Sequence, residues 1–253
     1  MTVISPQNDG ESRTIVDICK RLNMDLRIST QPWGATLDQE PPEHLQNLKR
    51  VVVVVEMPSL TLESKLRDQG HQVEIVDHHY YPKIGLDRRQ PLSSLEQVAN
   101  LLDYNLTRWE MGIAINDRNY IFGLLDAGYS FDEILEIRKF DLEAQGVPPE
   151  NIVKVREALK TAPVKKGITI LRLDFPSAGY AQDFLVLETP DQVRDLLILT
   201  GNPVRKAQFY GDPVKIQKLA EIGEWMGGGD KSKFWGTNHP DVQEIFRRLN
   251  IED

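Results

Sequence analysis

The sequence contains a single cysteine, Cys19, among 253 residues. One thiol can form neither an internal disulfide nor a cysteine-based zinc knuckle. Cys19 lies within the helical pattern IVDICKRL, where it is expected to face a core. Disulfide scaffolds and zinc knuckles are therefore excluded.

Long apolar runs are also missing. No stretch of about 18 apolar residues, the length that a membrane span requires, occurs in the chain. The segment MTVISPQNDG lacks the basic and apolar blocks of a signal peptide. We expect a cytoplasmic protein with no membrane partner.

Positive charge is in deficit, because 30 Lys and Arg face 38 Asp and Glu, for a net charge of -8. Binding to long duplex nucleic acid needs clustered Lys and Arg, so that class of partner is not expected. A compact phosphorylated ligand is still compatible, since a local site can be positive on an acidic protein. The apolar content of 40% is ordinary for a globular protein with a real core.

Strand and helix patterns alternate along the chain, which indicates the α/β class. The five consecutive valines within 50–56 fit a central strand covered on both faces. The following helix and strand, at 60–70 and 71–79, complete the strand–helix–strand unit of a parallel sheet. Further strands are expected at 2–5, 112–115, 168–175, 183–188, 196–201 and 204–211, and further helices at 12–22, 94–105, 119–128, 130–146, 149–159, 190–197, 213–225 and 240–249.

We therefore predict an α/β fold with two domains. Residues 1–160 would form a parallel-sheet domain, and residues 161–253 a smaller α/β domain that carries the Gly-rich segment MGGGDKSKFWG. A cleft between the two domains is expected to hold the ligand.

Acidic side chains follow four of the expected strands: Asp9, Glu56, Asp77 and Asp117. The stretch VEIVDHHYYP adds two adjacent histidines, His78 and His79, to the strand end at Asp77, although the chain has only five histidines in all. In a parallel sheet these ends share one edge, where ligands bind. Carboxylates with an imidazole suit Mn²⁺, with Mg²⁺, Co²⁺ and Zn²⁺ as alternatives. The alternative interpretation is that each acid only caps a following helix. This explains the acids but not the paired histidines.

The motifs NDGES, VVVVVEMPS, VDHHYYP, SSLEQVANLL and AINDRNYI occur in the order typical of the DHH phosphoesterase superfamily, and the chain resembles that family over nearly its whole length. The resemblance implies that Asp9, Glu56, His78 and Asp117 hold a metal ion. It also implies that His79 contacts the substrate phosphate or leaving group, with Asp77 orienting His78 through its other ring nitrogen. The expected substrate-binding residues are Arg118 and, in the Gly-rich segment, Gly227, Gly228, Gly229 and Lys231.

Four positions depart from the family pattern: Ser5 and Gln7 stand where metal ligands are usual, Glu56 stands where an aspartate is usual, and Asp230 stands where a histidine is expected. Whether one ion, two or none binds is therefore left open. The predicted function is a metal-dependent phosphoesterase, preferring Mn²⁺ and acting on a short oligonucleotide or other small phosphorylated substrate. The alternative is a degenerate homologue that binds a phosphate ligand or protein partner without hydrolysis. An inorganic pyrophosphatase is disfavoured, because that chemistry relies on the missing ligands.

Overall fold

The structure is a computed structural model that describes residues 1–81, 84–175, 179–188, 194–228 and 233–251. It divides into two compact units, Met1–Gly146 and Val147–Asp253. The division falls before the helix at 149–161 rather than after it, so this helix belongs to the second unit. The expected cleft between domains stays a prediction.

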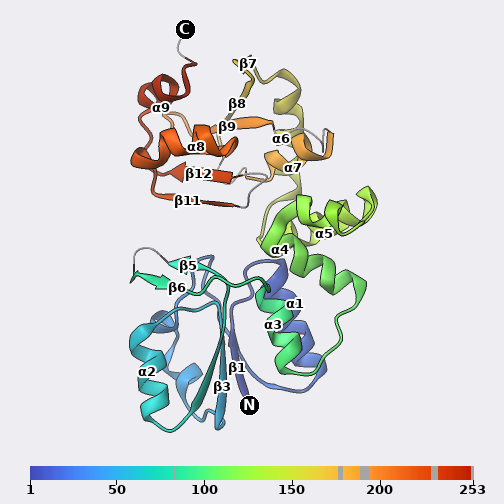
Figure 1. The fold of residues 1–253 in the computed structure, drawn as a ribbon, viewed down its shortest axis with the longest axis vertical. Coiled ribbons are helices and arrows are strands. Elements are labelled where there is room, and N and C mark those ends of the chain that lie inside the picture. The colour runs from blue at the N-terminus through green and yellow to red at the C-terminus, as the bar shows by residue number, and fades with distance from the viewer. Residues whose placement is uncertain (82–83, 176–178, 189–193, 229–232, 252–253) are drawn as a thin grey trace. The chain divides into compact units, whose positions relative to one another are not determined.

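The first unit is built on a four-stranded parallel sheet of order β2-β1-β3-β4. The valine strand β3 lies inside this sheet with four of its five residues buried, as the sequence predicts. Figure 1 shows α2 on one face of the sheet and α1 with α3 on the other. The strands are β1 (Thr2–Ser5), β2 (Asp25–Ile28), β3 (Val51–Val55) and β4 (Gln72–Val76), and a hairpin of β5 (Tyr80–Tyr81) and β6 (Leu86–Asp87) follows β4.

The helices of the first unit begin where the sequence places capping residues. Ser93, Thr107 and Ser130 each form a capping box with a glutamate three residues later. The helices are α1 (Gly10–Arg21), α2 (Leu60–Asp68), α3 (Ser94–Leu101), α4 (Arg108–Asp126) and α5 (Phe131–Ala144), and two 3-10 turns lie at Leu37–Gln39 and Pro42–Leu45.

The strand expected at 112–115 is wrong, because these residues lie inside α4. A short apolar run has no period that separates a buried helix from a buried strand. At Gly112 the helices α4 and α5 approach closely, since an added Cβ would lie 2.5 Å from Ile137 Cδ1. The buried run therefore packs against another helix and not into the sheet.

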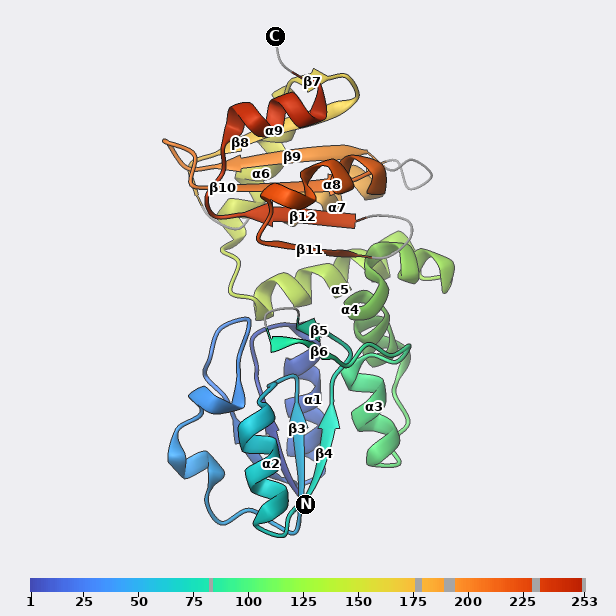
Figure 2. The ribbon, with the colours of Figure 1, turned by 60° about the vertical axis from the view of Figure 1, so that its left-hand side comes forward.

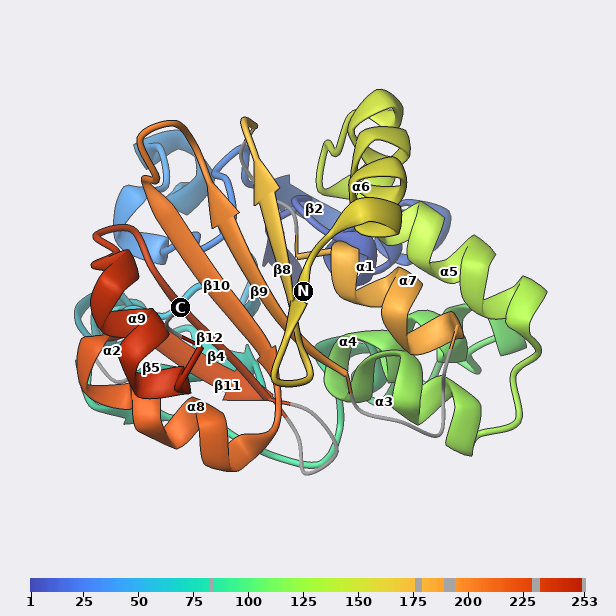
Figure 3. The ribbon, with the colours of Figure 1, turned by 90° about the horizontal axis from the view of Figure 1, so that it is seen from above.

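The second unit contains a six-stranded mixed sheet of order β11-β12-β10-β9-β8-β7, in which only β8 and β9 are parallel among the described strands. Figure 3 shows α8 and α9 on one face of this sheet and α6 with α7 on the other. The elements are α6 (Pro149–Thr161), β7 (Val164–Lys165), β8 (Ile168–Leu173), α7 (Ala181–Glu188), β9 (Asp195–Thr200), β10 (Lys206–Gly211), α8 (Pro213–Leu219), a 3-10 turn (Ala220–Ile222), β11 (Trp225–Gly228), β12 (Lys233–Thr237) and α9 (Val242–Leu249).

Two expectations for the second unit are wrong. The apolar run 183–188 belongs to the helix α7, and residues 195–197, expected in a helix, begin the strand β9. Every residue of β9 is buried, so no alternation of polar and apolar positions marks it in the sequence. The α/β class itself is confirmed in both units. No helix of the described ranges combines the length and apolar character needed to cross a bilayer.

Candidate metal centre

Parallel pairing brings the ends of β3 and β4 to one edge of the sheet. Val55 pairs with Val76, so Glu56 and the segment from Asp77 leave the sheet side by side. Figure 2 shows this edge beneath the β5–β6 hairpin. The backbone N–H of Glu56 donates to Val76 O at 2.9 Å, and Glu56 takes a left-handed φ of 50°. For a non-glycine residue that conformation costs roughly 1–3 kcal/mol and persists where surrounding contacts hold it.

Four side chains converge at this edge, and we call them the acid–histidine cluster: Glu11, Glu56, His78 and Asp117. Each offers one ligand atom, and these atoms all lie within 4.8 Å of one another. His78 Nε2 is at the centre, 2.8 Å from Asp117 Oδ2, 3.4 Å from Glu56 Oε1 and 3.8 Å from Glu11 Oε2. Of the residues predicted from the sequence, the structure thus brings together Glu56, His78 and Asp117.

Three atoms of the cluster are buried without a hydrogen-bond partner: Glu11 Oε2, His78 Nε2 and Asp117 Oδ2. The 2.8 Å contact between His78 and Asp117 is therefore short but poorly oriented for a hydrogen bond. A buried polar atom left unpaired costs about 1–3 kcal/mol, and more when it is charged. Ligands around one ion at about 2.1 Å lie roughly 3–4 Å from one another, so a shared cation would satisfy all three atoms.

The pKa shifts in the cluster are also those expected of a cation-binding site. Burial lowers the pKa of His78, but Asp117 and Glu56 outweigh it and raise that pKa to about 10. Burial and the charges of Asp117 and Glu56 raise the pKa of Glu11 well above its usual value. Burial alone would raise the pKa of Glu56, yet its contacts with both histidines and Ser94 lower it. The protonated form of His78 is therefore favoured, and the ionised form of Glu11 disfavoured, by the same buried charges that would attract a cation.

The first turn of α3 supports two of the acids. Ser94 Oγ donates to Glu56 Oε1 at 2.7 Å, and the backbone N–H of Leu95 donates to Glu11 Oε1 at 2.9 Å. The positive end of a helix dipole also favours nearby carboxylates. Each acid therefore has one oxygen held by α3, and in Glu11 the other is free for a ligand.

A second support comes from α5. Asp141 Oδ1 accepts the backbone N–H of Gly10 at 3.0 Å, and Arg138 donates to Asp141 Oδ2 at 2.6 Å and to Asn116 Oδ1 at 3.2 Å. Gly10 precedes Glu11, and Asn116 precedes Asp117. A Cβ at Gly10 would lie 3.1 Å from Asp141 Cα, which explains the glycine. One buried ion pair therefore ties together the two segments that carry these acids.

His79 lies beside the cluster with its side chain 41% exposed. Asp77 Oδ1 accepts its backbone N–H at 3.0 Å and lies 3.1 Å from its Nδ1, and Asp77 Oδ2 accepts from Tyr81 Oη at 2.9 Å. Burial lowers the pKa of His79, but Asp77 and Glu56 raise it above its ordinary value overall. The prediction that Asp77 orients His78 is corrected: it orients His79, because the chain turns there.

Asp9 belongs to neither of the two possible ligand groups among the described residues, which are the acid–histidine cluster and the set Glu56, His78 and His79. It is the N-cap of α1, where its Oδ1 accepts from Ser12 N at 2.8 Å and from Ser12 Oγ at 2.7 Å. Burial, with the charges of Glu56 and Asp117, raises its pKa to about 7. Asp9 is close enough to Glu56 and Asp117 for their charges to raise its pKa. Its predicted role as a metal ligand stays a prediction, and Glu11 is a further acid beside the predicted ligands.

Sequence reasoning missed Glu11, although it stands inside the quoted motif NDGES. An acid in the first turn of a helix reads as a partner of the helix dipole. Glu11 differs from an ordinary first-turn acid in two ways that only the structure shows. It is 2% exposed, and the backbone N–H of Leu95 on α3 donates to it.

The structure describes three of the five predicted substrate-binding residues, Arg118, Gly227 and Gly228. Arg118 follows Asp117 on α4, and its Nε donates to Glu96 at 2.8 Å. Gly227 and Gly228 belong to β11, where a Cβ on Gly227 would lie 2.7 Å from the Phe234 ring. Gly229 and Lys231, with Asp230, lie outside the described residues. Phosphate binding by any of these residues stays a prediction.

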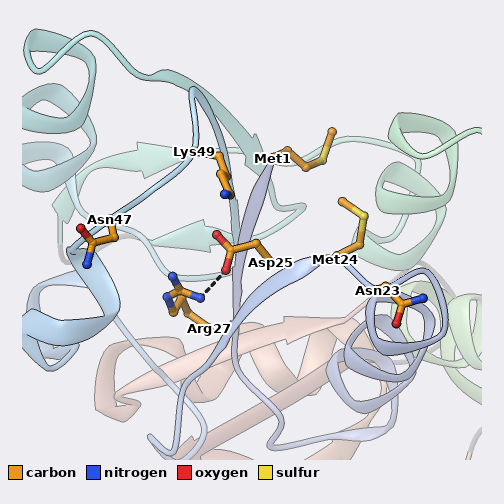
Figure 4. Close-up of a pocket in the computed structure, with 7 residues that line it drawn as sticks. All are labelled: Met1, Asn23, Met24, Asp25, Arg27, Asn47 and Lys49. Carbon is orange, nitrogen blue, oxygen red and sulfur yellow. Dashed lines mark hydrogen bonds and ion pairs between the residues drawn. The ribbon is translucent and has the colours of Figure 1, made fainter.

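The first unit also has a depression of about 520 Å³ near the amino ends of its strands. Figure 4 shows Asp25 paired with Arg27 there, beside Lys49 and Met24. Parallel strands place their amino ends at the opposite edge from Glu56 and His78. This depression is thus separate from the cluster.

Comparisons with known proteins give distant similarities only. No protein-family model and no curated protein matches the chain. An exonuclease RecJ bound to manganese matches at 12% identity and a TM-score of 0.47, covering 98% of this chain and 88% of that one. A RecJ from Thermus thermophilus in complex with Mn²⁺ matches at 14% and 0.47, over 98% of this chain, which spans about half (51%) of that one. PggH, a pGpG-specific phosphodiesterase from Vibrio cholerae, matches at 13% and 0.48, over 98% and 97%.

Proposed function

We propose that the first unit is a metal-dependent phosphoesterase that hydrolyses a small phosphorylated substrate. The observation that carries this proposal is the acid–histidine cluster, whose three unpaired buried atoms lie within 4.8 Å of one another. Its oxygens and single imidazole suit Mn²⁺ best, and Mg²⁺, Co²⁺ and Zn²⁺ less selectively. The motif resemblance in the sequence supports phosphoester chemistry over other hydrolyses.

Glu11, Glu56, His78 and Asp117 would hold the ion. When bound, a divalent cation supplies positive charge for a phosphoryl oxygen and lowers the pKa of nearby water toward neutrality. The buried carboxylates lose their mutual repulsion as it binds. Support from α3 and from Asp141 fixes the two acids on α1 and α4 before any ligand arrives.

His79 would act on the substrate. Its Nδ1 faces Asp77, and its raised pKa favours the protonated ring. A protonated imidazole that is partly exposed beside the cluster can donate a hydrogen bond to a phosphate oxygen and a proton to a departing alkoxide. Asp77 keeps the ring in place by accepting from Nδ1.

The proposed substrate is a short oligonucleotide or a nucleotide phosphodiester. The net charge of -8 disfavours long polyanions, since these need many cations along a track. A single phosphodiester needs only a local positive centre.

The test is hydrolysis of bis(p-nitrophenyl) phosphate by the full chain with MnCl₂. Substituting His78→Ala is expected to abolish Mn²⁺-dependent turnover. The matched control is His239→Ala, because that side chain is 84% exposed and lies in the second unit. Equal turnover in the His78→Ala variant would refute the proposal.

A second function is favoured by one observation. Ser5 is fully buried, and its Oγ donates to Pro6 O at 3.0 Å, so this position offers no charged ligand. With fewer ligands the same cluster would bind an ion and a phosphate without turnover. Binding of Mn²⁺ by calorimetry, combined with no hydrolysis of any phosphodiester, would select this function.

A further inference from the structure

The second unit has its own depression, of about 560 Å³, which we call the β8–β9 pocket. It lies where the parallel strands β8 and β9 end, because Leu173 pairs with Thr200 and Gly201 N donates to Leu173 O at 2.8 Å. Asp174 and Asn202 thus leave the sheet next to each other. Figure 3 shows α6 beside these strand ends, and Lys154 on α6 lines the pocket. Carboxyl ends of parallel strands are where α/β sheets bind ligands.

The β8–β9 pocket is distinct from the Gly-rich segment. Strand β10 runs antiparallel to both β9 and β12, and its pairs Tyr210↔Leu196 and Gly211↔Lys233 place Lys233 level with the amino end of β9. Gly228 pairs with Lys233. The described ends of the Gly-rich segment therefore lie at the opposite edge of the sheet.

Two cations line the pocket, Lys154 and Arg172. Within the described residues neither side chain has an ion pair, although Lys154 Nζ lies 5.6 Å from the centre of the Phe175 ring. Asp174 is the single acid in the lining. On a chain of net charge -8, two cations left available at one depression select an anionic ligand.

The remainder of the lining selects a ligand with a flat apolar part. Five of the ten lining residues are apolar: Ala158, Leu173, Phe175, Leu199 and Val204. An inorganic anion would leave these surfaces unused, and a polymer would need many more cations. The volume is within the range of roughly 300–1,000 Å³ that small-molecule sites have.

We propose that the β8–β9 pocket binds a nucleoside monophosphate or a small molecule of the same build. The phosphate lies against Arg172 and Lys154, and the ring lies against Phe175 and the apolar floor. Asp174 and Asn202 form hydrogen bonds with the hydroxyl and amino groups of the ligand. This site does not depend on the acid–histidine cluster.

The test is isothermal titration calorimetry on the full chain in EDTA, which removes divalent cations. AMP, GMP, CMP and UMP are the probes, and at least one is expected to bind with one-to-one stoichiometry. Arg172→Gln is expected to weaken that binding at least about tenfold, since it removes a charge-assisted contact. Ala158→Phe is expected to abolish nucleotide binding, because the larger side chain fills the apolar part of the pocket while Lys154 and Arg172 are kept.

Lys160→Gln is the matched control, because Lys160 is exposed on the same helix, pairs with Glu157 and does not line the pocket. It is expected to bind as the unchanged chain does. Three results would overturn the proposal: no binding of any nucleotide at millimolar concentration, unchanged binding in Arg172→Gln, or binding of inorganic phosphate as tight as that of the best nucleotide.

Discussion

Replacing Glu11 by glutamine removes one negative charge from the acid–histidine cluster and keeps the shape of the side chain. Without an ion the change is expected to be nearly neutral, because burial and the charges of Asp117 and Glu56 raise the pKa of Glu11 and so disfavour its ionised form. The remaining amide oxygen can still accept the N–H of Leu95. Stability of the ion-free chain therefore changes little, whereas binding of a cation loses a charged ligand.

The scale of the loss is that of one unit charge acting on another at short range inside a protein. At about 4 Å and an effective dielectric constant of about 20, one unit charge on another contributes about 4 kcal/mol. A loss of this size makes the dissociation constant for Mn²⁺ roughly a thousandfold larger.

Thermal unfolding with and without MnCl₂ measures the effect. At a Mn²⁺ concentration of 100 times Kd the unchanged chain gains about 2.7 kcal/mol, which raises Tm by roughly 5–10 °C for a protein of this size. The Glu11→Gln variant at the same concentration is expected to gain under about 0.1 kcal/mol. Glu43→Gln, an exposed acid of the first unit, is the control and should keep the full shift. A full shift in Glu11→Gln would refute a metal role for this side chain.

Four further outcomes are expected. The pKa of Asp9 in the folded state, about 7, lies above its ordinary value of 3.8. The proton on Asp9 therefore stabilises the folded state at low pH, and this stabilisation is lost as pH rises through 7. Asp9→Asn should flatten the fall in the Tm of the ion-free chain between pH 4 and 7, and an unchanged slope would count against the raised pKa. Because a cation must displace protons from the site, the Tm gain on adding Mn²⁺ should be larger at pH 8 than at pH 5.5, and an equal gain at both would contradict proton release. His79→Ala should lower turnover about 10²–10⁴-fold and leave the Mn²⁺-induced Tm shift intact, with Asp77→Asn acting in the same direction; loss of the Tm shift in His79→Ala would make His79 a ligand instead. Asp141→Asn, which breaks the buried pair with Arg138, should destabilise the chain by about 3–5 kcal/mol and weaken Mn²⁺ binding about 10–100-fold; unchanged binding by calorimetry would remove Asp141 from the support of the cluster.

The parallel sheet of the first unit was predictable because its strands carry strong local signals. Five valines after a Pro-rich loop predict a buried strand, and the paired histidines His78 and His79 at the next strand end indicate a site. Capping residues such as Ser93 and Ser130 mark helix starts through chemistry that acts within four residues. These features depend on neighbours in the sequence.

The parts that failed depend on contacts between distant segments. Asp117 was placed after a strand, yet it lies in α4, whose apolar run packs on α5. Finding Glu11 beside the predicted ligands required the position of α3, whose Leu95 N–H donates to this acid. The link from Asp77 to His79 depended on the direction in which the chain turns after β4. None of these is encoded in spacing alone.

Anomalous diffraction from crystals grown with MnCl₂ tests the proposed metal centre most directly. We predict a manganese peak enclosed by Glu11 Oε2, Glu56, His78 Nε2 and Asp117 Oδ2, each within about 2.0–2.4 Å of it. Millimolar Mn²⁺ with no peak there, and with His78 Nε2 still 2.8 Å from Asp117 Oδ2, would show that these side chains hold a proton and not a metal ion.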